Sequence, residues 1–558
     1  MKKPPDKISN PRRSSTWLGF ATREPTNRGT VKIRIRWDKV ALLLLFLGIF
    51  SWMGKSLALY YFFKDVRRFE EVSFMDMVVF PMNRSGVRVQ QGNYQIEQAK
   101  SALEREDYRR AFGLLREGLV RAPANTEGRI LLAQLYSGWR PDLAIEVLEN
   151  GLDDGKDNSE FVQLLFALLL ANKEDNSVLE ISEGLLSESL PEEIIRTARV
   201  ARLQSAMLRG RFDITKEVFS ESDVENSLDG VLIGTQLYQR SGRADTARNV
   251  LEAIIDSKPK GDLGPLYFQL VNILRDEGLE DLAREMALEY VIHDPLTWRP
   301  RVLLIDVLFS NDLLERRDQE IEALMLQHRG NEQAMAALAQ VCGQHGNVRA
   351  ATKLYEVALE NGFNLGKFIL ILVEANIRDG QYDKAIGLCN ELAREDPGWL
   401  VTEESTFNAI RSLAYYMSGD SELGSLYLRD FLESRRIGES TLYQAAFSMN
   451  QYGFPEQALL ILERAYAVNP RNESVLSLMI SVEMDLGAYF SISEHLTSLF
   501  AQRRPEYTLM EDIHKRLQSD RFLFTENRGY LLQQLREIIA EQEAMDWDIW
   551  EPYNEQAS

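Results

Sequence analysis

Hydrophobic and polar positions form two different patterns along this chain. Residues 40–63 read VALLLLFLGIFSWMGKSLALYYFF, an apolar run that contains one charge, Lys55. From Gly92 onward, helical segments instead alternate with short breaks that contain Gly or Pro. The first pattern predicts one membrane-spanning helix, and the second predicts an array of paired helices.

The apolar run is long enough for a transmembrane helix, which needs about 20 residues. The segment Val40–Gly54 is uncharged, so Lys55 is expected near the far interface with its charged end in water. Basic residues are more numerous before the run than just after it, which places residues 1–39 in the cytoplasm and residues 64–558 across the membrane. Aromatic residues suited to the two interfaces flank the run: Trp37, Trp52, Tyr60 and Tyr61.

Two alternatives to an uncleaved signal anchor remain open. A cleaved signal peptide needs a small-residue cleavage site, and Ser56–Leu57–Ala58 is a poor one. A buried core helix would show an amphipathic period, which Val40–Gly54 lacks.

A short motif recurs through the second part of the chain. It consists of Gly, an aromatic residue two positions on and Ala three further on, as in GQYDKA (Gly380, Tyr382, Ala385). Taking the last residue of the motif as an anchor, the spacing averages roughly 34 to 35 residues, a period typical of helical repeats. The anchor positions are Ala111, Ala144, Val178, Thr215, Ala247, Ala283, Arg317, Ala351, Ala385, Gly424, Ala458 and Ile492. Proline stands twelve residues after five anchors: Pro123, Pro259, Pro295, Pro397 and Pro470.

Each unit is interpreted as a helix, a tight turn, a second helix and a break. Glycine allows the positive φ that ends the first helix, and the small anchor lets the two helices approach closely. Proline cannot continue the second helix. One hairpin cannot bury its apolar face alone, so neighbouring hairpins must stack into a solenoid.

In its period and its Gly, Tyr, Ala and Pro positions, the chain resembles the tetratricopeptide repeat (TPR) family over residues 92–506. The resemblance implies a right-handed α-solenoid of about 12 helix-turn-helix repeats. Together with the transmembrane helix predicted by the apolar run, the expected fold is all-α. The pattern is weakest at Val178, Arg317 and Gly424.

The resemblance also implies a groove lined by the first helix of each unit. Counting back 18, 15, 14, 11, 8 and 7 residues from the anchors gives an amide-rich face with aromatic residues, which suits the main chain of an extended peptide. The alternative is that Gln is simply a good helix former on a solvated face. The candidate groove residues are Gln236, Gln239, Phe268, Asn272, Arg275, Gln340, Gln344, Glu374, Arg378, Tyr443, Gln444, Phe447, Asn450 and Gln451.

Charge and composition exclude several classes of protein. The 558 residues carry a net charge of −20, yet residues 1–40 hold 11 basic and three acidic residues. The acidic remainder argues against broad nucleic-acid binding. An apolar content of 45% is too high for a disordered chain.

The sequence lacks the motifs of common catalytic and metal sites, including phosphate loops, HExxH, GxSxG and CxxC. Cys342 and Cys389 fall on apolar repeat positions, where small core residues are a better interpretation than a redox pair. A disulfide between neighbouring repeats would become possible in an oxidising compartment. We therefore expect no enzyme activity, no cofactor and no metal.

These patterns predict a basic cytoplasmic arm without regular structure (1–39), a signal anchor (40–63), a linker (64–91), the solenoid (92–506), and capping helices with an acidic, aromatic tail (507–558). The expected protein is a scaffold in the bacterial cytoplasmic membrane whose solenoid faces outward. It is expected to bind peptides or helices of partner proteins in its groove and so to assemble or position a cell-envelope complex. The alternatives are a cytoplasm-facing assembly or quality-control adaptor and a glycan-binding or enzymatic envelope protein. The partner and the oligomeric state are left open.

Overall fold

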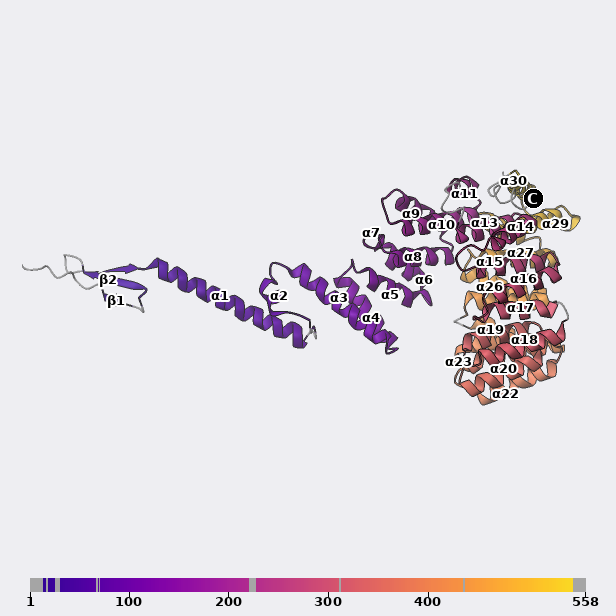
Figure 1. Ribbon diagram of the computed structural model, residues 1–558, viewed down its shortest axis with the longest axis horizontal. Helices are drawn as coiled ribbons and strands as arrows, with labels where there is room; N and C mark the ends of the chain where they lie inside the picture. Colours follow the sequence, from indigo (N-terminus) through magenta and orange to yellow (C-terminus); the bar gives the residue numbers. More distant parts are fainter. Residues whose placement is uncertain are drawn as a thin grey trace, which may run out of the picture. The chain divides into compact units, whose positions relative to one another are not determined.

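The computed structural model describes residues 14–16, 19–25, 31–66, 69, 71–219, 227–310, 313–434 and 437–544. The chain divides into two compact units, Met1–Leu168 and Leu169–Ser558. The first unit contains β1 (Ser14–Thr16), β2 (Ala21–Pro25), β3 (Val31–Ile35), α1 (Trp37–Tyr61), η1 (Phe62–Val66), α2 (Phe74–Val79), α3 (Arg84–Leu103), α4 (Tyr108–Arg121), α5 (Thr126–Ser137), α6 (Pro141–Glu149) and α7 (Leu152–Gly155), and α8 (Ser159–Ala171) crosses into the second (Figure 1).

A small antiparallel sheet precedes the helices, in the order β1-β2-β3. Its register pairs Thr22 with Arg34 and Arg23 with Ile33. The sheet lies within residues 1–39, where we expected no regular structure. The alternation of apolar and basic residues in VKIRI has the period of a strand and is the signal that the expectation overlooked.

Helix α1 contains the predicted apolar run. Its side chains from Leu42 to Met53 are exposed, and its length and hydropathy are sufficient for crossing a membrane. A core helix would bury at least one face, so the exposure of this segment does not fit that alternative.

The last turns of α1 are covered by the residues that follow. Helix α2 packs against α1, and Trp52 Nε1 donates a hydrogen bond to the Val78 carbonyl at 3.0 Å. Ser56 is buried at this contact. The covering core consists of Phe69, Val72, Met77 and Val87, with Leu59, Tyr60, Phe63, Phe80 and Tyr94 against it.

The segment predicted as a linker, 64–91, is mainly helical in its described part. Ser73 and Asp76 form a capping box that starts α2, and the Asn83 side chain caps the start of α3. Gly92 lies inside α3, where this helix contacts α4. A Cβ at this position would lie 2.7 Å from the Gly118 carbonyl oxygen of α4, so a side chain would not fit there. This glycine allows two helices to approach closely and does not end one.

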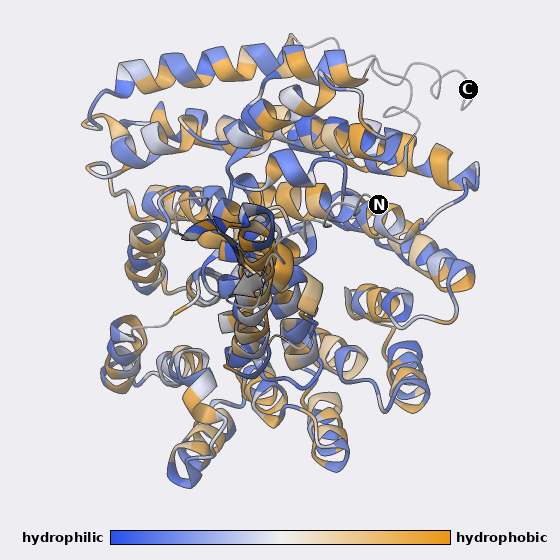
Figure 2. Cartoon of the chain, turned by 90° about the vertical axis from the view of Figure 1, so that its left-hand side faces the viewer, coloured by the Kyte–Doolittle hydropathy of each residue, from blue (hydrophilic) through white to orange (hydrophobic). Residues whose placement is uncertain are grey.

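The second unit consists of helices that pack in consecutive pairs. Along most of them hydrophilic and hydrophobic residues alternate, as expected for amphipathic helices (Figure 2). Their bounds are α9 (Asp175–Leu186), α10 (Glu192–Arg209), α11 (Phe212–Phe219), α13 (Leu228–Arg240), α14 (Ala244–Asp256), α15 (Gly264–Asp276), α16 (Glu280–His293), α17 (Arg299–Ser310), α18 (Leu314–Gln327), α19 (Glu332–Gln344), α20 (Val348–Asn361), α21 (Leu365–Arg378), α22 (Tyr382–Glu395), α23 (Leu400–Ser418), α24 (Ser421–Glu433), α25 (Glu439–Gln451), α26 (Pro455–Val468), α27 (Glu473–Leu486), α28 (Ile492–Phe500), α29 (Tyr507–Leu517), η2 (Asp520–Phe522) and α30 (Arg528–Glu543).

The predicted helical-hairpin solenoid is confirmed. Every anchor lies in the second helix of a pair, from Ala111 in α4 to Ile492 in α28, and all are buried except Arg317. Arg317 is half-buried because its guanidinium stacks over Phe309 at 4.7 Å from the ring centre. The small-residue rule for the anchor therefore fails at this one hairpin.

Among the described residues, the position five before the anchor has a positive φ in ten hairpins. Glycine fills eight of these positions, with φ between 68° and 89°: Gly210, Gly242, Gly278, Gly346, Gly380, Gly419, Gly453 and Gly487. Glu106 and Lys173 stand at the same position in two early hairpins, with φ of 60° and 62°. The expected role of glycine is confirmed, and these two side chains are accommodated at a cost of about 1 kcal/mol each.

The first and last hairpins of the second unit touch each other. Arg503 binds Asp175 through two hydrogen bonds of 2.8 and 2.9 Å and also donates to the Leu170 carbonyl. The backbone N–H of Arg504 donates to the Leu208 carbonyl at 2.6 Å. Arg240 binds both Glu473 and the Arg504 carbonyl. Helices α13 and α14 accordingly lie near α27 and α29 in Figure 1, and the array closes on itself.

After the last hairpin, α29 packs on α27 and α30 packs on α28. Met510, Ile513, Leu517, Leu531 and Leu535 are buried in the same core as the preceding hairpins. These two helices cover apolar surface that a further hairpin would otherwise bury. The predicted aromatic tail, with Trp547 and Trp550, lies outside the described residues.

Candidate partner-binding groove

All the candidate groove residues lie on first helices, and none is buried. They lie on α13 (Gln236, Gln239), α15 (Phe268, Asn272, Arg275), α19 (Gln340, Gln344), α21 (Glu374, Arg378) and α25 (Tyr443, Gln444, Phe447, Asn450, Gln451). The repeat register therefore placed each of them on a solvent-accessible face of the expected helix.

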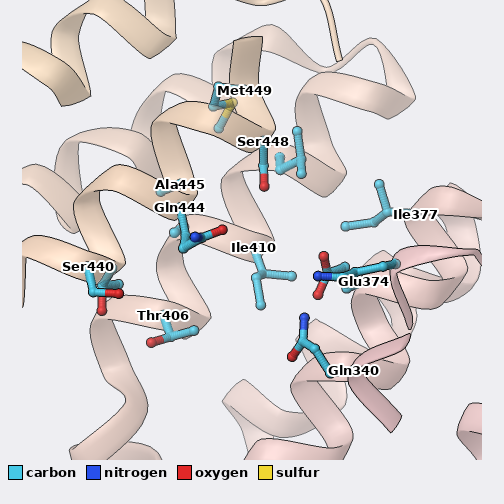
Figure 3. A pocket seen from close by; sticks show the side chains of 14 residues that line it. Gln340, Glu374, Ile377, Thr406, Ile410, Ser440, Gln444, Ala445, Ser448 and Met449 are labelled. Carbon is cyan, nitrogen blue, oxygen red and sulfur yellow. The ribbon is translucent and has the colours of Figure 1, made fainter. Parts of the chain in front are cut away.

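Four of these residues meet in one pocket of about 470 Å³. Gln340 and Gln344 come from α19, Glu374 from α21 and Gln444 from α25. The view in Figure 3 shows Gln340 and Glu374 on one side of the space and Gln444 on the other, with Ile410 between them. The remaining candidates lie outside this pocket.

Helix α23 contributes a wall that the candidate set missed. Thr406, Ala409, Ile410 and Leu413 line the pocket. They lie 18, 15, 14 and 11 residues before the Gly424 anchor, so the same counting rule applied to that unit would have found them. Because its motif is weak, the unit supplied no candidates. The other lining residues are Ile377, Ser440, Thr441, Ala445, Ser448 and Met449.

Glu374 is the only ionisable group among the residues that line this pocket. Partial burial raises the pKa of its carboxyl group, and the positive charge of Arg378 opposes this effect only in part. Within the described chain, no hydrogen bond or ion pair holds the carboxylate. The pocket therefore offers an acceptor for a cationic or amide donor, surrounded by hydroxyl, amide and aliphatic groups.

Arg378 is held at the edge of this site. Its Nε donates to the Gln344 carbonyl at 2.8 Å, and its guanidinium lies over Tyr452, 5.3 Å from the ring centre. Farther along α25, Tyr443 and Phe447 stack with their ring centres 6.3 Å apart, and Phe447 is 44% exposed. An accessible aromatic pair thus lies next to the polar pocket, on the same helix as Gln444.

Arg275 is already occupied within the fold. Its Nη1 donates to Asp306 Oδ2 at 2.7 Å, and His345 Nε2 lies 2.7 Å from Asp306 Oδ1. Burial alone would raise the pKa of Asp306, but His345 and Arg275 outweigh burial and lower it. This triad joins α15, α17 and the end of α19, so Arg275 has a structural role and is a weaker candidate for partner binding.

The two cysteines are free and buried. Burial raises the pKa of the Cys342 thiol and of the Cys389 thiol to about 12. Both thiols are therefore protonated at neutral pH and unreactive, as expected for small core residues.

No family model and no curated protein matches the sequence. Several solved structures are similar to the chain. A tetratricopeptide repeat protein from Parabacteroides merdae is 15% identical, covers 46% of this chain and 97% of its own, and gives a TM-score of 0.28. Yeast Tom70 is 12% identical over 83% of this chain and 99% of its own, with a TM-score of 0.29. The Cut9–Hcn1 structure is 13% identical over 83% of this chain and 96% of its own, with a TM-score of 0.25.

Proposed function

We propose that this chain is a membrane-anchored scaffold that binds extended segments of partner proteins on the first-helix face of its second unit. The observation that carries this proposal is the pocket between α19, α21, α23 and α25, with the unpaired carboxylate of Glu374 among amides and hydroxyls. Such a surface binds a peptide main chain through its amides and hydroxyls and selects a side chain through the carboxylate.

The partner segment is expected to place Lys, Arg or an amide side chain opposite Glu374. Apolar neighbours of that residue would contact Ile377, Ile410, Leu413 and Met449. The stacked rings of Tyr443 and Phe447 suit an aromatic or aliphatic residue farther along the segment.

A peptide titration tests this specificity. Extended peptides that differ only in a central Arg, Gln or Glu are titrated against the purified full chain, with fluorescence anisotropy as the readout. The Arg peptide should bind at least tenfold more tightly than the Glu peptide, and Glu374→Gln should remove most of that difference. Equal affinities for all three peptides would contradict the proposal.

Crosslinking in cells identifies the partner. A photoreactive residue is placed at Ser448 in the pocket or at Glu463, which is exposed on α26 of the same hairpin. Adducts specific to Ser448 that diminish in Glu374→Gln support groove binding. The same adducts at both positions would refute it.

The membrane anchor and the orientation of the chain across the membrane are the last part of the proposal. Exposed α1 supports insertion in the membrane, and the basic residues before it favour a cytoplasmic N-terminus in a bacterial cell. Protease added to spheroplasts should digest residues 64–558. A protected solenoid would instead favour the cytoplasm-facing adaptor.

A further inference from the structure

A second pocket, of about 720 Å³, lies in the first unit beside the end of α1. Its walls come from η1, from the end of α2, from the start of α3 and from α4. Phenylalanines and arginines make up its most prominent lining: Phe62, Phe63, Phe80, Arg84, Arg88 and Arg116.

The arginines are available to an anion. In the described part of the chain, neither Arg84 nor Arg116 has a carboxylate partner, and both are exposed. Arg84 lies over the Phe80 ring and Arg116 over the Phe112 ring, at 6.0 and 5.7 Å from the ring centres. Arg88 donates one hydrogen bond to the Val120 carbonyl and keeps further donors. The one acidic lining residue, Glu117, already binds Arg121 and Gln95.

The apolar side of the pocket is equally accessible. Phe62 is 43% exposed and Val120 is 70% exposed. A small inorganic anion would gain nothing from these side chains, whereas a ligand with both a phosphate and alkyl chains would contact both sides.

The position of the pocket relative to the apolar part of α1 indicates the same kind of ligand. The uncharged stretch Val40–Gly54, which is exposed from Ala41 onward, is centred near Leu47. Half of a hydrocarbon layer is about 15 Å thick, or about ten residues of helix, which brings the boundary close to Leu57, just beyond Lys55. The headgroup layer extends roughly 5 to 7 Å farther, so Phe62 and the three arginines lie at its depth or just beyond it.

We propose that this pocket binds the phosphate of an anionic phospholipid, with Arg84, Arg88 and Arg116 around the phosphate and the phenylalanine rings against the glycerol and upper acyl chains. The inference rests on the membrane anchor of the proposed function. Bound lipid would hold the hairpin α3–α4 at the membrane surface and limit the movement of α1 relative to it.

Titration of the full chain in neutral detergent tests the site. The probes are short-chain phosphatidylglycerol, phosphatidylcholine of the same chain length, and inorganic phosphate, with binding measured by calorimetry. Phosphatidylglycerol should bind at least tenfold more tightly than the other two. Equal binding of both lipids would overturn the proposal, and inorganic phosphate that competes as well as the lipid would identify a free-phosphate site instead.

A matched pair of variants separates specific contacts from net charge. The variant Arg84→Gln, Arg88→Gln, Arg116→Gln should lose at least tenfold in phosphatidylglycerol affinity. The control Arg105→Gln, Arg109→Gln, Arg110→Gln removes the same charge from exposed positions of the same hairpin that do not line the pocket. Equal loss in both variants would overturn the proposal, and unchanged circular dichroism of both shows that the fold is intact.

Alkaline carbonate extraction distinguishes failure of the anchor from failure of the pocket. Wild-type and variant chains should both stay in the membrane pellet, because α1 holds them there. If carbonate releases the chain while arginine-dependent lipid binding persists, the anchor is refuted and the pocket stands.

Discussion

Backbone conformation at single residues sets the geometry of each hairpin. The turn before the second helix needs a positive φ, which costs a non-glycine residue about 1 kcal/mol. Glycine is therefore recurrent at this position, and Glu106 and Lys173 are exceptions whose cost the surrounding hairpins offset.

Substitution at this turn should have opposite effects in two hairpins. Glu106→Gly should stabilise the α3–α4 hairpin by about 1 kcal/mol, and Gly453→Ala should destabilise the α25–α26 hairpin by about the same amount. At Gly453 an added Cβ meets nothing within 4 Å, so the effect isolates backbone strain. Native-state hydrogen exchange of each hairpin measures both changes, and effects of the same sign would refute the explanation.

Asp306 links three helices through one carboxylate. Asp306→Asn should destabilise the hairpins around it by about 2 kcal/mol, because two charge-assisted hydrogen bonds are lost. Since the pKa of Asp306 is lowered in the fold, its stabilisation is complete at neutral pH and disappears as the pH falls below the ordinary carboxyl value. Denaturation of both proteins at pH 7 and pH 3 checks this, because their difference should shrink in acid.

The proposed partner binding is expected to depend on pH through Glu374. The pKa of the Glu374 carboxyl group is raised, so the folded chain holds this proton more tightly than the unfolded chain does. The free energy of unfolding therefore decreases as the pH rises and this carboxyl group ionises. A cationic peptide binds only the ionised form, so its affinity should fall as the pH decreases from 7.5 to 5. Glu374→Gln should bind weakly with no such trend, whereas an unchanged trend in this variant would assign the titration to another group.

The small anchor residues permit the two helices of each hairpin to approach closely. Ala385 in α22 is fully buried, whereas Ala393 on the same helix is exposed. Ala385→Leu should destabilise the α21–α22 hairpin by about 1 to 3 kcal/mol, because the added atoms separate the helices. Ala393→Leu adds the same atoms on the exposed face and should change stability by less than about 0.5 kcal/mol; comparable losses in chemical denaturation would contradict this role of the anchor.

Closure of the second unit is a property of the whole array. The Arg503–Asp175 pair is nearly buried, with side chains 13% and 1% exposed, whereas the Arg471–Glu174 pair beside it is 62% and 41% exposed. The buried pair should therefore hold the first and last hairpins together, and the exposed pair should contribute little.

Two matched variants test this closure. Arg503→Gln should destabilise the contact by about 3 to 5 kcal/mol, because Asp175 is left buried without its partner. Hydrogen exchange should increase in α9, α10 and α29 and remain unchanged near Ala385. Arg471→Gln removes the same charge and should leave exchange unchanged; equal effects of both variants would refute a specific role for Arg503.

The sequence by itself determined the repeat, the helix pairs, the turn glycines and the apolar run of α1, because these depend on local backbone preference and on periodic burial. The repeat register also placed each candidate groove residue on an accessible face of its first helix. The α23 wall was missed because the Gly424 unit has a degenerate motif, although its helix packs like the others.

Only the tertiary structure decided which of these residues meet. Gln340, Glu374 and Gln444 belong to three hairpins. The distances between their side chains depend on how much each hairpin is rotated relative to the next. The Arg503–Asp175 contact spans more than 300 positions, and the arginine–phenylalanine pocket joins η1, α3 and α4. Such contacts depend on small rotations accumulated over many helices, which no local pattern in the sequence records.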